Sequence, residues 1–415
     1  MIECRQRSFV EDYPMNNKKT LALIGCGKFA RHFMPLFMAH PSVEKLYVCD
    51  LIRDKAEEFS RDFGAEIIDS YEKALASPEI DAILNFTERH IHGDIVIRAL
   101  KAGKNVYSAV PMASKVEECG EIVELVKKTG LIYFMAETCY YYPCAMLCRE
   151  EFEKGTFGDF CYGASQYYHN IDNIGYGKTA ERGMPPLLYP THSTAMILSA
   201  MDTYVTEVAC FGYADAKGDP AFKKDGNAWG NEYVSQYVMM RLANGGIARV
   251  SEARSFGWNK PSSYISGFYG TKAGYEFSNA QHLIIEKDFT TEAEHVTLRD
   301  VSDYVNPADM VAAKGLPDFK ERVANGEWQW SSPAEIQRKE VERVPSELDG
   351  IVSGHMSSHK LLVDDFMRAL VSGKQPVLNA CRAARYTVPG LVAIESCKMG
   401  GKVLPVPDFG APEEE

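Results

Sequence analysis

The sequence lacks the features expected of a membrane or nucleic-acid-binding protein. No apolar run approaches the roughly 20 residues that a membrane-spanning helix needs. Basic residues are outnumbered, with 45 Lys and Arg against 57 Asp and Glu, and the net charge of −12 repels phosphate backbones and anionic lipid. The segment before Thr20 has neither the apolar stretch nor the cleavage site of a secretory signal. We therefore expect a cytoplasmic protein that binds neither nucleic acid nor membranes.

Cysteine occurs eleven times, but in no arrangement typical of a metal site. Cys139, Cys144, Cys148 and Cys161 lie close together in the sequence, yet their spacing matches neither a CxxC pair nor a ferredoxin pattern. Scattered thiols in a large chain are typical of a reducing compartment rather than of a disulfide framework. The prediction is therefore that the protein holds no metal.

The first part of the chain alternates short apolar strands with helical periods, which predicts a doubly wound parallel sheet. A chain of 415 residues has room for two or three domains. The expected strands are 20–25, 45–50, 82–86, 105–110 and 131–136, and the expected helices are 30–39, 53–63, 95–103 and 116–128.

Beyond Gly158 the pattern changes to long stretches of alternating hydrophobicity joined by glycine-containing turns. These stretches predict the hairpins of one large, open, mostly antiparallel sheet. We place the boundary between an N-terminal domain, 1–140, and a second α+β domain, 141–415, whose last helices pack back on the first. The expected elements are strands at 204–213, 232–242, 247–255 and 263–277, an irregular region at 288–353 with a helix at 333–342, and closing helices at 359–372 and 380–398.

The loop after the first strand fits the pattern GxGxxA with Gly25, Cys26, Gly27, Lys28, Phe29 and Ala30. The first glycine permits a tight turn, and the second lets a pyrophosphate approach the backbone at the start of the helix. Asp50 ends the next strand, where a carboxylate accepts hydrogen bonds from ribose hydroxyls and repels a 2′-phosphate. A structural turn with a surface aspartate is the alternative. The strand–helix context favours a Rossmann domain that binds NAD, with NADP disfavoured.

Two further segments resemble the Gfo/Idh/MocA family of oxidoreductases. Phe86–His92, followed by Ala99–Val106, is similar to the family's ATPNxxH…AL-AGK-V pattern, with Thr87 and His92 in place. The resemblance covers nearly the whole chain and implies a Rossmann domain joined to an open antiparallel sheet. It also implies hydride transfer at a hydroxyl of a sugar or sugar derivative, and a homodimer or homotetramer packed through the sheet.

Two departures from the family pattern change the expected chemistry. Most dehydrogenases of the family carry Glu-Lys-Pro after the fifth strand, whereas this chain has Ala109, Val110 and Pro111. Valine carries no proton to transfer, so the usual acid/base lysine is absent. The pattern Asp-x-x-x-His keeps its histidine as His192 but has Leu188 in place of the acid.

Val-Pro together with Tyr-Pro-Thr-His resembles the family's NAD-dependent α-N-acetylgalactosaminidases. Such enzymes oxidise the sugar at C3, eliminate the leaving group, add water and reduce the ketone again. The resemblance to the family and to this branch implies cofactor contacts, beyond the GxGxxA loop and Asp50, at Thr87, Glu88, His92, Ala109, Val110 and Thr138.

His192, Tyr189 and Tyr167 are the expected catalytic residues. An imidazole titrates near neutral pH and can take the proton of a sugar hydroxyl, although a structural histidine in the core is the alternative. The two phenols can orient or protonate a sugar oxygen. The aromatic residues 140–142 follow the sixth strand and could stack on a sugar or only seal the domain junction. The expected substrate contacts are Tyr140, Tyr167, His169, Tyr189, Thr191 and His192.

Three functions remain open at this point. The first is a net NAD-dependent sugar dehydrogenase, and the second is a redox-neutral NAD-dependent glycosidase. The third is a non-catalytic protein that senses NAD or a sugar, which the missing lysine favours. Retention of His192 and the tyrosines favours the two enzymes over the sensor.

Overall fold

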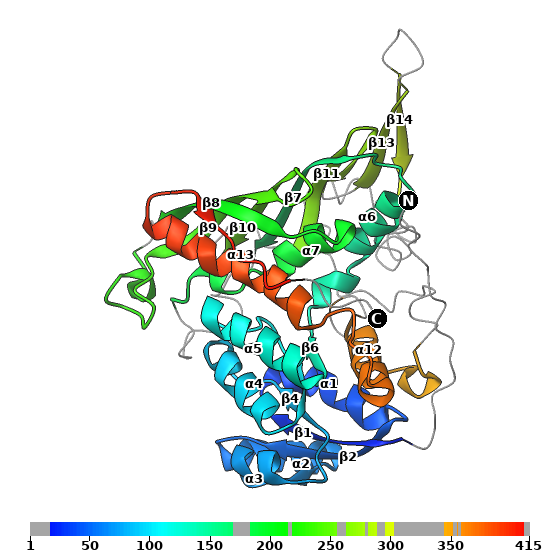
Figure 1. Cartoon of the computed structure of the whole chain (residues 1–415), viewed down its shortest axis with the longest axis vertical. Helices are drawn as coiled ribbons and strands as arrows, with labels where there is room; N and C mark the ends of the chain where they lie inside the picture. Colours follow the sequence, from blue (N-terminus) through cyan, green and yellow to red (C-terminus); the bar gives the residue numbers. More distant parts are fainter. Residues whose placement is uncertain are drawn as a thin grey trace, which may run out of the picture.

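The fold is taken from a computed structural model of the chain, and it consists of two sheets linked by long C-terminal helices (Figure 1). The structure describes residues 17–168, 183–214, 218–254, 263–278, 281–288, 295–302, 344–351, 355 and 358–410. Within this part of the chain, no helix is both long and apolar enough to cross a membrane.

The N-terminal sheet is parallel in every pair and confirms the predicted doubly wound arrangement. Its strand order is β3-β2-β1-β4-β5-β6. Successive strands are added on one side of β1 up to β3 and on the other side from β4 onward, so the switch point lies between β1 and β4. Ligands of such folds bind outside the carboxyl ends of the strands at that switch point. The strands are β1 (Lys19–Ile24), β2 (Val43–Cys49), β3 (Glu66–Ile67), β4 (Ala82–Asn85), β5 (Asn105–Ser108) and β6 (Tyr133–Met135).

Five helices accompany this sheet, and their ends follow local chemistry. Gly64 and Gly130 adopt the left-handed conformation that ends α2 and α5, and the Ser70 side chain caps α3. α4 and α5 pack together, and α1 contacts α2. The helices are α1 (Lys28–Ala39), α2 (Arg53–Phe63), α3 (Tyr71–Ala76), α4 (His92–Lys101) and α5 (Val116–Thr129).

In the described part of the chain, the second sheet has nine strands in the order β14-β13-β12-β11-β7-β10-β9-β8-β15. Among the described strands of this second sheet only the β7–β10 pair is parallel, which confirms the prediction of an open, mostly antiparallel sheet. Its strands are β7 (Phe160–Tyr168), β8 (Val205–Ala214), β9 (Tyr233–Leu242), β10 (Ile247–Ala253), β11 (Ser263–Gly270), β12 (Ala273–Ser278), β13 (Gln281–Asp288), β14 (His295–Asp300) and β15 (Leu404–Pro405).

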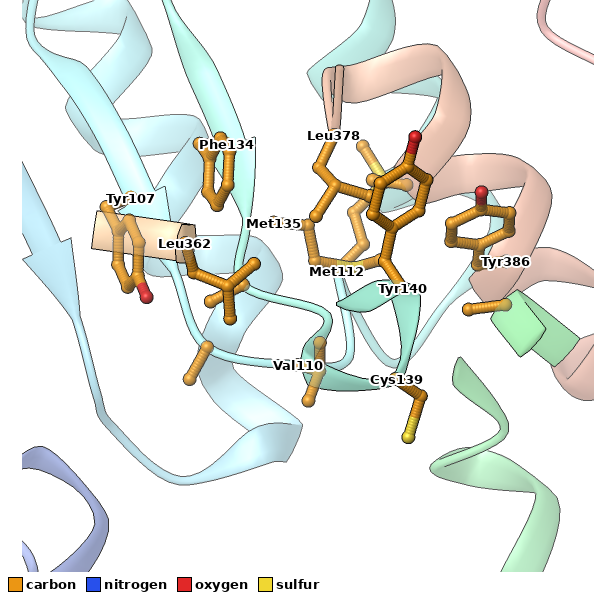
Figure 2. Packing of buried hydrophobic residues seen from close by; sticks show 14 of the residues in the cluster. Tyr107, Val110, Met112, Phe134, Met135, Cys139, Tyr140, Leu362, Leu378 and Tyr386 are labelled. Atoms are coloured by element: carbon orange, nitrogen blue, oxygen red, sulfur yellow. The ribbon is translucent and has the colours of Figure 1, made fainter. Parts of the chain in front are cut away.

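Four helices connect the two sheets. α6 (Pro143–Glu153) and α7 (Thr191–Met201) pack together, and α7 lies against β7, β10 and β11. α13 (Ala380–Lys398) contacts β8 of the second sheet and α5 and β6 of the first, while α12 (Ser358–Ser372) packs on α1 (Figure 1). One hydrophobic core therefore extends through the junction, as Figure 2 shows for residues such as Tyr107, Phe134, Met135, Leu362, Leu378 and Tyr386.

Several predicted elements need correction. The expected irregular region, 288–353, contains β14, an edge strand whose four described side chains, at 297–300, are all exposed. The predicted strand 263–277 is two strands joined by the turn at 271–272, and α1 starts at Lys28 rather than residue 30. β3 and α3 were not predicted. The helix expected at 333–342 lies outside the described residues, and the proposed boundary at residue 140 stays a prediction.

Candidate active site

The phosphate loop has the geometry that a dinucleotide requires. Gly25 has a φ of +97°, and a Cβ there would lie 2.6 Å from the carbonyl oxygen of Phe86, so only glycine fits. Gly27 caps α1, and no described atom lies within 4 Å of where its Cβ would stand. This leaves open space over the first amides of a helix, where a phosphate is stabilised. The residues present fit a pyrophosphate.

Asp50 lies beside this loop, at the carboxyl end of β2. Its Oδ2 accepts a hydrogen bond from the N–H of Cys26 at 2.8 Å, and its Oδ1 accepts one from the N–H of Ile52 at 2.8 Å. Each carboxylate oxygen has a second lone pair for a ribose hydroxyl. Leu51 and Ile52 follow with exposed side chains, which can pack against an adenine. These two contacts were not predicted, although two apolar residues directly after Asp50 in the sequence could have indicated a surface for the adenine.

The loops after β4 and β5 carry the other predicted cofactor residues. Thr87 is anchored by its hydroxyl, which donates to Oδ1 of Asn85 at 2.7 Å. Val110 and Ala109 are buried at the end of β5. His92 is also buried, and its ring nitrogens lie 2.8 Å from the carbonyl oxygen of Pro111 and 3.1 Å from that of Thr87. His92 therefore ties the two loops together, which places it as a support for the cofactor loops.

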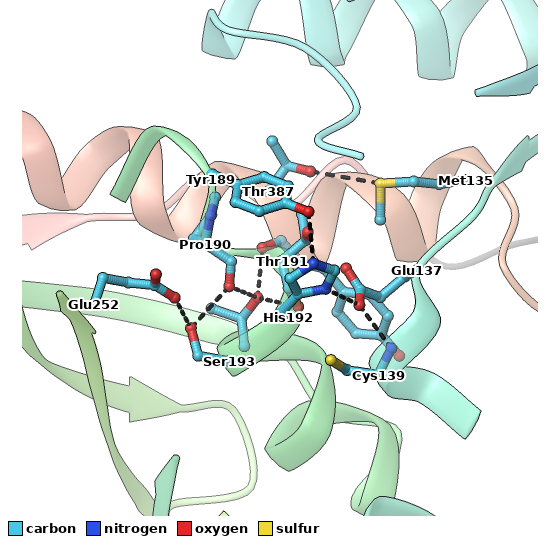
Figure 3. A network of polar contacts seen from close by, with 12 residues as sticks. Met135, Glu137, Cys139, Tyr189, Pro190, Thr191, His192, Ser193, Glu252 and Thr387 are labelled. Atoms are coloured by element: carbon cyan, nitrogen blue, oxygen red, sulfur yellow. Dashed lines mark hydrogen bonds and ion pairs between the residues drawn. The ribbon is translucent and has the colours of Figure 1, made fainter. Parts of the chain in front are cut away.

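A hydrogen-bonded line of three side chains lies at the carboxyl end of β6. Nδ1 of His192 is 2.6 Å from Oε1 of Glu137, and Nε2 of His192 is 2.6 Å from the hydroxyl of Tyr189 (Figure 3). His192 stands in the first turn of α7, and Tyr189 follows the short helix η5 (Pro186–Leu188). The ring of Tyr167 from β7 is 5.1 Å from the His192 ring and 5.7 Å from the Tyr189 ring. The structure thus brings together the three predicted catalytic residues.

Glu137 is a candidate site residue that the sequence did not reveal. It lies 55 residues before His192 in the chain and supplies the carboxylate that Leu188 lacks. Burial opposes its ionisation, but the imidazole of His192, the nearby hydroxyl of Thr191 and the backbone N–H of Cys139 together hold the pKa of Glu137 below its usual value. An ionised Glu137 accepts the Nδ1–H of His192, so Nε2 is the nitrogen that accepts the phenol proton of Tyr189.

A second buried acid lies behind this line. The hydroxyl of Ser193 donates to Oε1 of Glu252, and Nη1 of Arg254 donates to its Oε2 at 3.0 Å (Figure 3 shows the Ser193–Glu252 contact). Burial outweighs the attraction of Arg254 and raises the pKa of Glu252 to about 8. The guanidinium of Arg254 also lies 5.0 Å from the centre of the Tyr167 ring. This network was not predicted, and it places the Arg254 guanidinium against the Tyr167 ring.

The other predicted site residues are placed as follows. Thr191 begins α7 next to Glu137, and Thr138 lies in η2 (Thr138–Tyr141), where its buried hydroxyl has no hydrogen-bond partner among the described residues. The ring of Tyr140 lies under the guanidinium of Arg149 at 3.8 Å and beside α13, so it packs at the domain junction. His169 lies outside the described residues.

Glu137, Cys139 and His192 also form a group whose ligand atoms all lie within 4.8 Å of one another, a donor set that Zn²⁺ accepts. Hydrogen bonds already explain this proximity, because Oε1 of Glu137 contacts both Nδ1 of His192 and the N–H of Cys139. Burial and the charge of Glu137 raise the pKa of the Cys139 thiol well above its usual range, which disfavours the thiolate that a metal needs. A metal-free site stays our proposal.

Comparisons with known proteins agree with this geometry. Residues 19–137 match the Gfo/Idh/MocA model, described as an oxidoreductase family with an NAD-binding Rossmann fold. A glycosyl hydrolase family 109 protein of Streptomyces filamentosus is 23% identical over 438 residues, covering 98% of this chain and 80% of its own length. The scyllo-inositol 2-dehydrogenase (NAD(+)) of Bacillus subtilis (strain 168) is 27% identical over 187 residues, covering 44% of this chain and 51% of its own.

A solved structure shares the whole architecture. A levoglucosan dehydrogenase in complex with NADH and levoglucosan superposes with a TM-score of 0.68 at 18% identity, covering 94% of this chain and 100% of that chain. At this identity the likeness concerns the fold, which is a Rossmann domain joined to an open sheet. The N-terminal domain is thus an NAD-binding Rossmann domain by both its sequence and its structure.

Proposed function

We propose that this chain, whose residues 19–137 match the model of the Gfo/Idh/MocA oxidoreductase family, transfers a hydride to NAD from the carbon that bears a hydroxyl of a sugar or sugar derivative. The observation that carries the proposal is the line Glu137–His192–Tyr189 at the carboxyl end of the Rossmann sheet. It provides a proton acceptor next to the place where the family binds its cofactor. The sugar specificity of the relatives supports a sugar as substrate.

The three residues act as a coupled base. The oxygen of Tyr189 accepts the proton of a sugar hydroxyl while its own proton passes to Nε2 of His192. Glu137 stabilises the imidazolium that forms, because its carboxylate lies 2.6 Å from Nδ1. This arrangement takes the place of the acid/base lysine that most dehydrogenases of the family carry where this chain has Val110. It also refines the expectation that His192 itself contacts the sugar, because the Tyr189 hydroxyl occupies Nε2.

The residues present fit NAD, which supplies a hydride acceptor when bound. Gly27 and the first amides of α1 would hold its pyrophosphate, and Asp50 would hold the adenosine ribose. The loops of Thr87 and Val110 would meet the nicotinamide end, with His92 holding both loops in place. Glu88, Thr138 and Ala109 stay proposed contacts.

The sugar would lie between the cofactor loops and the aromatic pair Tyr189 and Tyr167. The guanidinium of Arg89, on the loop after β4, stacks over the Tyr189 ring at 4.3 Å and fixes its position. Aromatic faces bind the apolar faces of sugar rings, and their hydroxyls fix the orientation. We propose Tyr167, Tyr189, Thr191 and His169 as substrate contacts. Tyr140 is the least supported substrate contact of the predicted set.

A redox-neutral glycosidase is the second candidate, and specific observations favour it. A relative whose match covers 98% of this chain is named a glycosyl hydrolase family 109 protein. Val110 also lacks the proton-transferring group of ordinary dehydrogenases of the family. In such a reaction the proton at C2 leaves after oxidation at C3, and the leaving group departs. The same coupled base could then return the proton to oxygen when the ketone is reduced.

The first test is substitution of His192. We expect His192→Ala to lower turnover by roughly 10²–10⁴-fold, as loss of a general base does, with NAD affinity unchanged. Turnover would be screened with scyllo-inositol, levoglucosan and p-nitrophenyl α-N-acetylgalactosaminide, after mass spectrometry of the dinucleotide that copurifies. His282→Ala is the matched control, because His282 is a buried histidine of the second sheet bonded to Tyr275. Equal turnover of His192→Ala and the control would contradict the proposal.

We also propose a homo-oligomer packed through the second sheet. Phe211 and Tyr213 on β8, and Tyr237 and Met239 on β9, are large apolar side chains exposed on its outer face, away from α13. Exposed apolar patches of this kind mark interfaces.

All ten cysteines in the described part of the chain are free thiols, which supports the prediction of a cytoplasmic setting.

A further inference from the structure

Four of the ten histidines form a line from the candidate active site to the surface of α1. The ring centres of His192 and His355 are 6.5 Å apart, those of His355 and His359 are 4.8 Å apart, and those of His359 and His32 are 6.3 Å apart. His192 is 4% exposed and His359 is fully buried, whereas His32 is exposed. The line therefore joins a buried base to solvent.

His355 stands where the line meets the cofactor site. Its ring lies 5.9 Å from that of Phe29 in the phosphate loop and 6.5 Å from that of His192. Its φ of +51° is in the left-handed region, which a residue with a side chain keeps only where its surroundings hold it there. His355 as a residue is exposed, and a dinucleotide seated on the loop would pass beside it. A bound cofactor and sugar would cover what remains exposed of His192, which is 4%.

His359 continues the line inside the protein. Its ring is stacked on Phe33 of α1 at 4.1 Å, and neither ring nitrogen has a hydrogen-bond partner among the described residues. An unpartnered imidazole in such a place costs free energy that an apolar side chain would avoid, so it needs an explanation. Burial, with His355 and His32 nearby, holds the pKa of His359 well below its usual range. A neutral ring carries one donor and one acceptor nitrogen.

We propose that His355, His359 and His32 relay the proton of the reaction between His192 and solvent. Each neutral ring accepts a proton on one nitrogen and releases the proton of the other nitrogen to the next ring, so no charge stays in the core. A rotation of the His192 ring, which releases Nε2 from Tyr189, hands the proton to His355, and one water spans the gap between His359 and His32. The relay rests on the proposed function, because net oxidation of a hydroxyl sends one hydride to NAD and one proton to solvent.

A first test needs no sugar. In the NAD-bound protein with 15N-labelled histidine, NMR would follow exchange of the His359 ring N–H with solvent. We expect fast exchange although the ring is buried, and a slowing of at least about tenfold in His32→Phe. His282 is the internal reference, because it is buried and bonded to Tyr275 outside the line. Equal His359 exchange in both proteins would overturn the relay.

A second test uses whichever of scyllo-inositol or levoglucosan is oxidised. We expect His359→Phe to lower steady-state turnover about tenfold more than it lowers single-turnover hydride transfer, because proton release becomes limiting. Added imidazole should restore turnover, which a merely structural defect would not show. His359→Gln is the second variant if the first does not fold. Unchanged steady-state turnover of the variant overturns the relay. If no sugar yields NADH with the natural protein, the proposed function is overturned, and the exchange test of the relay stays valid.

Discussion

Glu137 shows at the scale of single residues how the site compensates for its departures from the family. In the proposed mechanism the carboxylate that Leu188 lacks comes from Glu137 at the end of β6, and Tyr189 with His192 takes the place of the family's lysine, where this chain has Val110. Two chemical roles are therefore kept while the residues that fill them move to other positions in the chain. The charge of Glu137 is central to this account, because it fixes the tautomer and stabilises the imidazolium.

We predict that Glu137→Gln lowers kcat/KM by about 10²-fold or more with NAD affinity unchanged, because the amide keeps the hydrogen bond but loses the charge. Glu151→Gln is the matched control. Glu151 is also a buried glutamate with a lowered pKa, which Arg299 on β14 helps to hold down against the effect of burial. Steady-state kinetics with the oxidised sugar measures both variants. Full activity of Glu137→Gln would contradict the assigned role.

The acid beside Ser193 predicts a pH dependence of stability. The pKa of Glu252 is raised from 4.5 to about 8, so the folded state binds a proton that the unfolded state releases. Its contribution is fully present below pH 4.5 and is lost as the pH rises towards about 8. Glu252→Gln, which cannot ionise, should flatten the fall of the unfolding free energy over this interval. Urea unfolding at several pH values measures it, and an unchanged slope would contradict the assignment.

Asp50 determines the choice of cofactor in this account. We predict NAD binding at least about tenfold tighter than NADP binding, because a carboxylate at this place repels the 2′-phosphate. Asp50→Asn should narrow the difference while its side-chain oxygen can keep a bond to the N–H of Cys26. Calorimetry with both dinucleotides measures the ratio. Equal affinities of the natural protein for NAD and NADP would contradict this role.

Secondary-structure elements were predictable where the pattern was local. Buried parallel strands such as β1 and β4 appear as short apolar runs, and the glycine loop marks the start of α1. β3 was missed because two residues are too short to show a period. β14 was missed because its described side chains are exposed and its sequence is polar, so neighbouring β13 rather than its own sequence defines it as a strand.

The site was only partly predictable, for a related reason. The cofactor loop, His192, Tyr189 and Tyr167 have local signatures, so the sequence predicts them. Glu137, Glu252 and His359 have none, because their roles depend on elements that meet in three dimensions: the end of β6 with α7, β10 with α7, and α12 with α1. An isolated buried acid or histidine in the sequence gives no indication of its partner.

At the scale of the whole molecule, α13 and α12 hold the two sheets so that the base from α7 meets the carboxyl ends of the Rossmann strands. The outer face of the second sheet remains exposed, and we predict that it buries against a second copy. Phe211→Glu combined with Tyr237→Glu should yield monomers that still bind NAD. Light scattering after size exclusion measures the mass, with Met399→Glu as the control at another exposed apolar site. An unchanged mass of the double variant would contradict this interface.

The most direct test of the central claim, hydride transfer from a sugar to NAD, is the stoichiometry of NADH together with exchange at C2 of the sugar in heavy water. For a net dehydrogenase we predict one NADH released per sugar oxidised and no deuterium at C2 of the product. Deuterium at C2 with no accumulation of NADH would instead establish the redox-neutral glycosidase. Bound NAD with neither NADH nor exchange for any sugar or glycoside would contradict catalysis by Tyr189, His192 and Glu137.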